Sequence, residues 1–137
     1  MAAKKEDFGQ QQKLLNKELK EGRFRRTYLL CGEQAYLRIQ NRDRVRAALL
    51  GDGDEMNVSV YTGMDVTARE VIDQAQTLPF FADRRVIILE NSVFFSKKAS
   101  VESDTLAAFI PDIPETASII FVEENPDKRK KLYRAVQ

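Results

Sequence analysis

The chain has 137 residues, of which 43% are hydrophobic and 31% charged, and its formal net charge is +1. This composition is ordinary for one soluble globular domain with a single core. The absence of histidine removes the usual general base and the commonest metal ligand, so a zinc site and a Ser-His-Asp triad are both excluded. No run approaches the about 18 apolar residues of a membrane span, and no secretory signal is present. We therefore expect a cytoplasmic protein without a membrane partner.

Charge is unevenly distributed along the chain. Residues 1–50 carry twelve Lys and Arg against six Asp and Glu, residues 51–124 carry five against fourteen, and residues 125–137 carry five against one. An acidic middle between basic ends does not give the continuous basic face of a dedicated DNA-binding module. A nucleic-acid-binding module is therefore a disfavoured interpretation.

The expected elements alternate between helix and strand. Residues 1–9 are expected to form a disordered N-terminus, and short apolar runs predict four strands. In chain order we expect a helix at 10–21, a strand at 27–32, a helix at 34–50, a strand at 56–61, a helix capped by Thr67 and Glu70, a strand at 85–89, a helix at 101–110, a strand at 118–122 and a last helix from Lys128. This alternation builds a three-layer α/β fold with a parallel sheet between helices.

The loop after the first expected strand is the usual ligand position of such folds. A P-loop would read GxxxxGK[ST] there, whereas this chain reads Gly32–Ile39, GEQAYLRI. The second glycine, the lysine and the hydroxyl are missing, and Glu33 puts negative charge where a phosphate would lie. The third strand ends in a single Glu90, without a paired carboxylate for magnesium. We interpret this as a nucleotide-binding shape without cofactor, metal or catalysis; an NTPase with a degenerate motif is the alternative.

Two pairs of phenylalanines flank the strand at 85–89. Phe80 and Phe81 follow a proline in the short connection that precedes the strand, where they can either fill the core or offer a hydrophobic surface to a partner. Phe94 and Phe95 follow the strand, where core or lid contacts compete with a second interaction patch. The residues alone leave both alternatives open.

Three stretches together resemble the delta subunit of bacterial DNA polymerase III. They are Tyr28–Leu37 (YLLCGEQAYL), Gln76–Val86 (QTLPFFADRRV) and Asp127–Tyr133 (DKRKKLY), and the resemblance covers nearly all of the chain after about Leu14. It implies an AAA+-like fold in a clamp-loader subunit that does not itself hydrolyse ATP, within a DNA polymerase holoenzyme. It also implies that residues 10–137 are an N-terminal clamp-binding domain, a fragment without the lid and C-terminal oligomerisation domains.

The resemblance further implies a site. In that family a hydrophobic pair at the tip of the first domain opens the sliding clamp, and the pair falls on Phe80 and Phe81, with Leu78 beside them. The family pattern often has Leu before Phe, so the Phe-Phe pair is a departure. The implied partners are the sliding clamp (beta subunit), the other clamp-loader subunits through the absent domains, and primed DNA in the assembled complex.

Several cations are candidates for contacts with DNA or with the clamp. They are Arg84, Arg85, Lys128, Arg129, Lys130 and Lys131. For the first two, charges that keep a strand end soluble are an equal alternative. For the other four, the alternative is a solvated helix face.

Overall fold

A computed structural model describes residues 2–32, 34–53, 55–96 and 100–136 of the chain, with the backbone alone for residues 2–10 and Ser100. Four strands form one sheet in the order β1-β4-β3-β2, and every neighbouring pair is parallel. The strands are β1 (Thr27–Cys31), β2 (Val58–Thr62), β3 (Arg85–Glu90) and β4 (Ala117–Glu123). The predicted parallel sheet is confirmed.

The two central strands explain why the sheet forms here. Residues Val86–Leu89 of β3 are all apolar and buried, and Ile119 and Ile120 of β4 are fully buried beside them. A strand without polar alternation is stable only where helices cover both of its faces. The edge strands β1 and β2 bury fewer of their side chains.

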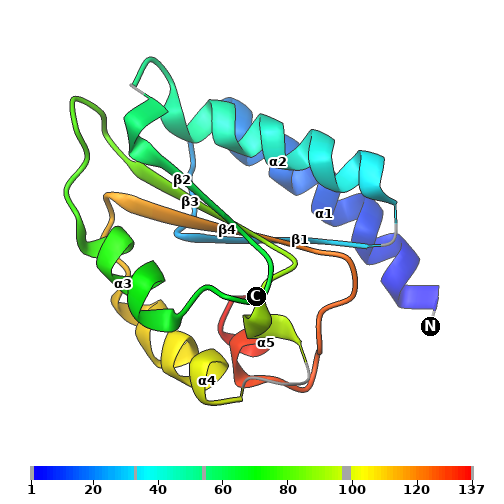
Figure 1. Ribbon diagram of the computed structural model, residues 1–137. Coiled ribbons are helices and arrows are strands. Elements are labelled where there is room, and N and C mark those ends of the chain that lie inside the picture. The colour runs from blue at the N-terminus through cyan, green and yellow to red at the C-terminus, as the bar shows by residue number, and fades with distance from the viewer. Residues whose placement is uncertain (1, 33, 54, 97–99, 137) are drawn as a thin grey trace.

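Helices cover both faces of this sheet and make it a three-layer fold (Figure 1). Those on one face are α1 (Ala2–Glu21) and α2 (Ala35–Leu50), whereas those on the other are α3 (Ala68–Gln76), α4 (Ser100–Phe109) and α5 (Lys131–Ala135). Each face has its own core. Val45 and Leu49 of α2 pack against Val86 and Ile88 on the first face, while α3, α4 and α5 pack against alternate residues of the same strands on the second.

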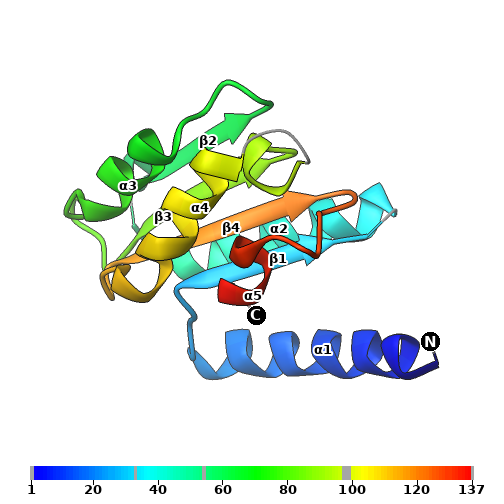
Figure 2. The ribbon, with the colours of Figure 1, turned by 90° about the horizontal axis from the view of Figure 1, so that it is seen from below.

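Helix α1 differs from the expectation. It begins at Ala2, so the segment expected to be disordered (residues 1–9) is helical in its described part, because this stretch contains the good helix formers Ala, Lys and Glu. The helix runs beside β1, the outermost strand on one side of the sheet (Figure 2). Its second half contacts the body through Leu15 and Leu19 and through paired amides of Gln12 and Asn41 at 3.0 and 2.9 Å.

Short 3-10 turns account for two further differences. Residues Glu55–Asn57 form a turn η1, so β2 begins two residues later than predicted. Residues Val93–Phe95 form a turn η2 in which both phenylalanines are fully buried, and the Phe95 ring meets the Phe121 ring edge-on, with centroids 5.1 Å apart. Phe94 and Phe95 are therefore core residues and not a second interaction patch. The last helix begins at Lys131, three residues later than predicted.

Candidate functional site

The candidate site is the connection at residues 77–84, which joins α3 to β3. Helix α3 starts at the predicted cap, where the Thr67 hydroxyl accepts a hydrogen bond from the Glu70 N–H at 3.2 Å. It ends before Pro79, because the residue preceding a proline is disfavoured in the helical conformation. The connection then crosses the edge of the sheet at which the parallel strands begin (Figure 1).

Three large apolar side chains of this connection face solvent, and we call them the tip. Leu78 is 77% exposed, Phe80 49% and Phe81 86%. The two rings meet edge-on, with centroids 4.5 Å apart and planes at 75°, which is a favourable aromatic geometry. The core interpretation of this phenylalanine pair is therefore wrong, since neither ring is buried.

A buried side chain from outside the connection holds its backbone. Asn57 has no exposed surface; its Nδ2 donates to the Phe80 carbonyl at 2.8 Å, and its Oδ1 accepts from the Phe80 N–H at 2.6 Å. Sequence reasoning missed this residue because it placed Asn57 inside the strand expected at 56–61, where no side chain was singled out. The available signal was its residue type, since Asn side chains often bond to loop backbone.

The two arginines at the start of β3 are engaged within the molecule. Arg84 donates to the Glu115 carbonyl at 2.9 Å, and its guanidinium lies 5.3 Å from the centre of the Phe24 ring. Arg85 is buried, and its Nη2 donates to Gln74 Oε1 at 2.6 Å. The expectation that Arg85 contacts DNA or the clamp is therefore wrong, because that side chain is not at the surface.

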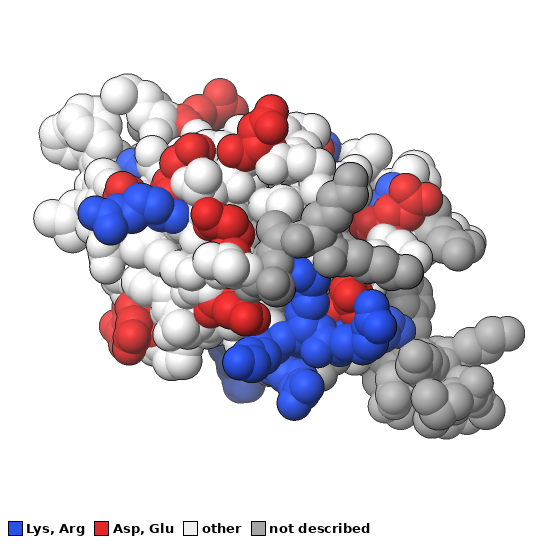
Figure 3. Space-filling view, turned by 60° about the horizontal axis from the view of Figure 1, so that its bottom comes forward, with Lys and Arg blue, Asp and Glu red and all other residues white. Residues whose placement is uncertain are grey.

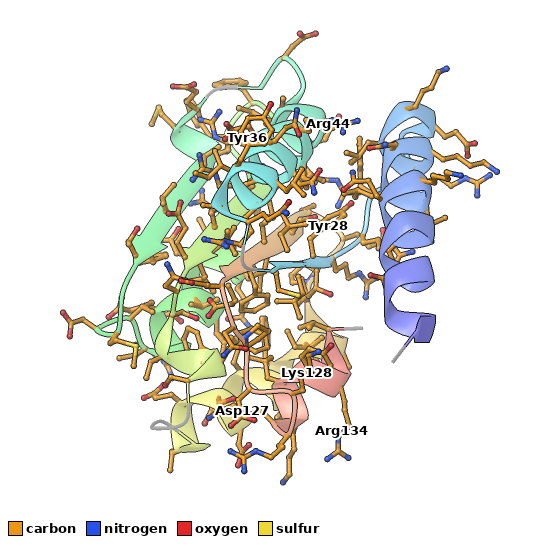
Figure 4. The ribbon with its side chains drawn as sticks, turned by 90° about the vertical axis from the view of Figure 1, so that its right-hand side faces the viewer. Tyr28, Tyr36, Arg44, Asp127, Lys128 and Arg134 are labelled. Atoms are coloured by element: carbon orange, nitrogen blue, oxygen red, sulfur yellow. The ribbon has the colours of Figure 1, made fainter. Side chains whose placement is uncertain are left out.

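The C-terminal basic run lies apart from the tip. Lys128, Arg129 and Lys131 are exposed and Lys130 is half-buried, and cations gather on the face that carries α5 (Figure 3). Asp127 and Lys128 lie beside this helix, at the opposite end of the view from α2 (Figure 4). Arg129 donates to both carboxylate oxygens of Asp127 at 3.1 Å, and these hydrogen bonds lower the pKa of Asp127 to about 2.

At the opposite edge, where the strands end, polar groups bond to one another. Arg42 of α2 forms an ion pair with Glu90 at the end of β3, with 3.0 Å between Nη1 and Oε1. Arg38 Nη1 donates to the Gly32 carbonyl in the loop that would hold a phosphate. Glu33, the other loop residue singled out from the sequence, lies outside the described residues. In its ion pair Glu90 has a structural role.

Glu123, at the end of β4, is a buried carboxyl group at the same edge. Its Oε2 accepts hydrogen bonds from the Ser92 N–H at 3.0 Å and the Ser92 hydroxyl at 3.3 Å. Burial raises its pKa to about 7, although the bonds from Ser92 act in the opposite direction. Within the described ranges, no group of three or more acidic or cysteine side chains is arranged to hold a metal ion, and no helix has the length and apolar character to cross a membrane.

The fold and this edge define a class: an AAA+-like α/β domain whose nucleotide loop departs from the P-loop pattern. Comparison with known proteins narrows the class. Residues 28–137 match the family model described as DNA polymerase III, delta subunit. The chain therefore belongs to the DNA polymerase III delta subunit family, as the three stretches of sequence predicted.

Individual relatives agree with this membership. The chain is 30% identical over 129 residues to DNA polymerase III subunit delta of Bacillus subtilis, a match that covers 88% of this chain and 37% of the relative. The solved Bacillus subtilis DNA clamp loader delta protein (YqeN) superposes with a TM-score of 0.75 at 26% identity, over 88% of this chain and 38% of that one. The chain thus spans less than two fifths of these relatives.

A more distant structure shares the fold alone. A DNA polymerase III, gamma subunit-related protein from Thermotoga maritima superposes with a TM-score of 0.59 at 12% identity, over 89% of this chain and 42% of that one. This similarity supports the predicted fold class and adds nothing about the site.

Proposed function

We propose that this chain binds a sliding clamp through the tip of Leu78, Phe80 and Phe81, and that this contact opens the clamp during DNA replication. The observation that carries the proposal is a pair of exposed aromatic rings on a held loop in a member of a clamp-loader family. Apolar side chains that project together from a surface are typical of a binding site, and aromatic residues supply most of the energy of many interfaces.

The energy available at the tip is sufficient for such a role. Transfer of each phenylalanine side chain from water into a partner's pocket contributes about 1.5–3 kcal/mol. A held loop retains most of this energy, because little conformational freedom is lost on binding. The same stiffness lets the tip displace parts of the clamp instead of yielding itself, and this is the property that opening requires.

We further propose that the chain does not hydrolyse ATP. Support comes from the missing P-loop residues after Gly32 and from the pairing of Arg42 with Glu90, the single carboxylate at the end of β3. Titration with Mg-ATP tests this point against the alternative of an NTPase with a degenerate motif. Tight Mg-ATP binding with release of phosphate would establish that alternative.

The remaining partners belong to the same proposal. Lys128, Arg129, Lys130 and Lys131 would contact phosphates of primed DNA in the assembled complex, and the half-buried Arg84 would contact an acidic surface of the clamp. Other clamp-loader subunits would bind through domains beyond residues 10–137, and the assembly would work in the cytoplasm. Salt-dependent retention of the assembled loader on primed DNA, with and without these four cationic side chains, tests the DNA contact.

The decisive experiment measures binding of the chain to its cognate clamp by calorimetry. The wild type is compared with the Phe80→Ala/Phe81→Ala variant and with Tyr36→Ala, a control that removes an exposed aromatic ring (74%) from α2. We expect the double variant to lose at least about 100-fold in affinity, since two rings contribute about 3–6 kcal/mol. We expect the control to bind as the wild type does, and all three proteins to melt at similar temperatures.

Two outcomes would contradict the proposal. One is a wild-type chain that is folded but does not bind the clamp. The other is equal affinity for the wild type and the double variant, which would move the contact to another surface. Opening has its own readout, namely the release of a labelled clamp ring from closed circular DNA, and a chain that binds without releasing the ring would limit the proposal to binding.

A further inference from the structure

The side chain of Asn57 bonds to both polar backbone groups of one residue in the connection. The residue lies in η1, before β2, yet both atoms of its amide group bond to the backbone of Phe80, 23 positions further along the chain. One bond fixes the Phe80 N–H and the other fixes the Phe80 carbonyl. An amide side chain is suited to this, since it donates and accepts at the same time.

A second contact joins the same two segments independently. A Cβ atom added to Gly53 would lie 2.7 Å from the Cβ of Ala82 and 3.0 Å from the Leu50 carbonyl oxygen. Such distances are too short for non-bonded atoms, so only glycine permits this approach. The segment that carries Asn57 is therefore packed against the connection on both sides of Phe81.

The backbone of Phe81 indicates that the connection is tightly constrained. Its φ angle is +49°, in the left-handed region that a residue with a Cβ atom adopts at a cost in energy. Such a conformation persists only where the surroundings determine it. Here it follows directly after the residue that Asn57 holds, and it leaves the Phe81 ring projecting beside the Phe80 ring.

We propose that Asn57 is the positioning residue of the tip. By bonding to both polar groups of the Phe80 backbone, it keeps the two rings projecting before a partner arrives, so that less order has to be created on binding. Asn57 is buried and touches no partner itself; it acts through Phe80 and Phe81. This inference rests on the proposed binding of the sliding clamp.

The test compares Asn57→Ala with Ser59→Ala in the 137-residue chain. Ser59 is a matched control, because it lies two residues further along and its hydroxyl donates to Gln74 Oε1 of α3 at 3.3 Å, outside the connection. Two quantities are measured: affinity for the cognate clamp by calorimetry, and hydrogen exchange of the Phe80 amide by NMR. Compared with the exchange of amides in the buried strand β3, the rate at Phe80 separates a local change in the tip from a general loss of stability, which would speed exchange at both.

We expect Asn57→Ala to bind the clamp about 10- to 100-fold more weakly, as two lost hydrogen bonds predict, and to exchange its Phe80 amide faster by a similar factor. Ser59→Ala is expected to match the wild type in both. If Asn57→Ala does not fold, Asn57→Asp replaces it: it keeps the volume and the acceptor but turns the donor at the Phe80 carbonyl into a second acceptor, so weaker binding is again expected.

The outcomes separate this inference from the function on which it rests. A folded Asn57→Ala chain with wild-type affinity, or with an unchanged Phe80 exchange rate, would overturn the positioning role while the function stands. Equal losses in Asn57→Ala and Ser59→Ala would overturn it as well, because the effect would then be one of general stability. Failure of every chain to bind, the wild type included, would instead remove the proposed function and the inference with it.

Discussion

The side chains at the two edges of the parallel sheet, where the strands begin and where they end, differ in exposure and in bonding. At the edge where the strands begin, Leu78, Phe80 and Phe81 project into solvent from a held backbone. At the edge where the strands end, Glu90 pairs with an arginine and Glu123 accepts two hydrogen bonds from a serine. The first edge leaves apolar surface exposed, whereas at the second the described carboxylates Glu90 and Glu123 bond to other side chains of the chain.

This difference indicates at which edge the binding of a partner is more favourable. Open α/β sheets usually bind ligands at the carboxyl ends of their strands, but here those groups already bond to one another, and a ligand would have to replace these bonds. The aromatic rings at the other edge are in contact with water, and the transfer of apolar surface from water into a partner's pocket is favourable. The chain thus favours an interaction at the edge opposite to the usual ligand site.

The largest expected effect contrasts two phenylalanines on either side of β3. Phe95 is 1% exposed and Phe81 86%, so truncation of Phe95 leaves a cavity in the core, whereas truncation of Phe81 leaves none. We expect Phe95→Ala to lower the free energy of unfolding by about 3–5 kcal/mol and Phe81→Ala to change it by less than about 0.5 kcal/mol. Urea denaturation measures both, and a large loss in Phe81→Ala would show that the tip supports the fold.

The second effect concerns the buried carboxyl group at the strand ends. Because burial raises the pKa of Glu123 from 4.5 to about 7, the folded chain holds a proton in this range that the unfolded chain has released. The stabilisation from this group is complete below about pH 4.5 and is lost as the pH rises through about 7, an effect of about 3 kcal/mol at most.

Glu123→Gln removes this dependence, because a neutral amide oxygen accepts the same bonds from Ser92 at any pH. We expect the variant and the wild type to be equally stable near pH 4, and the variant to be more stable by about 2–3 kcal/mol near pH 8. Urea denaturation at both pH values measures the difference. A constant difference across this range would mean that Glu123 titrates normally and that its edge is open to water.

The sheet could be predicted from the sequence because its signals are local. Runs of β-branched residues such as those of β3 and β4 form buried strands wherever helices flank them, and the cap at Thr67 depends on a partner three residues away. The start of α1 was harder to predict, because residues 2–9 lack an apolar stripe and only their composition favours a helix.

The site depended on contacts that sequence spacing does not display. Arg85 looked exposed because its charge stands at a strand end, yet it bonds to Gln74 on another element. Asn57 and Phe80 lie 23 residues apart. The residues alone left the phenylalanine pair undecided between core and surface, and the family resemblance favoured the surface before the structure showed both rings exposed.

The smallest expected effect tests how firmly the strand-end edge is closed. Arg42 and Glu90 are about one quarter exposed, at 23% and 25% of their side-chain surfaces, and partly hydrated pairs of this kind contribute about 0.2–1 kcal/mol. A double-mutant cycle with Arg42→Ala, Glu90→Gln and the combined variant should give a coupling in this range by urea denaturation, with clamp affinity unchanged in all three. A coupling near zero would mean that Glu90 is free for other partners. A coupling in the expected range, together with Mg-ATP binding that appears only when Arg42 is removed, would show that the ion pair, and not the altered loop after β1, keeps this edge closed.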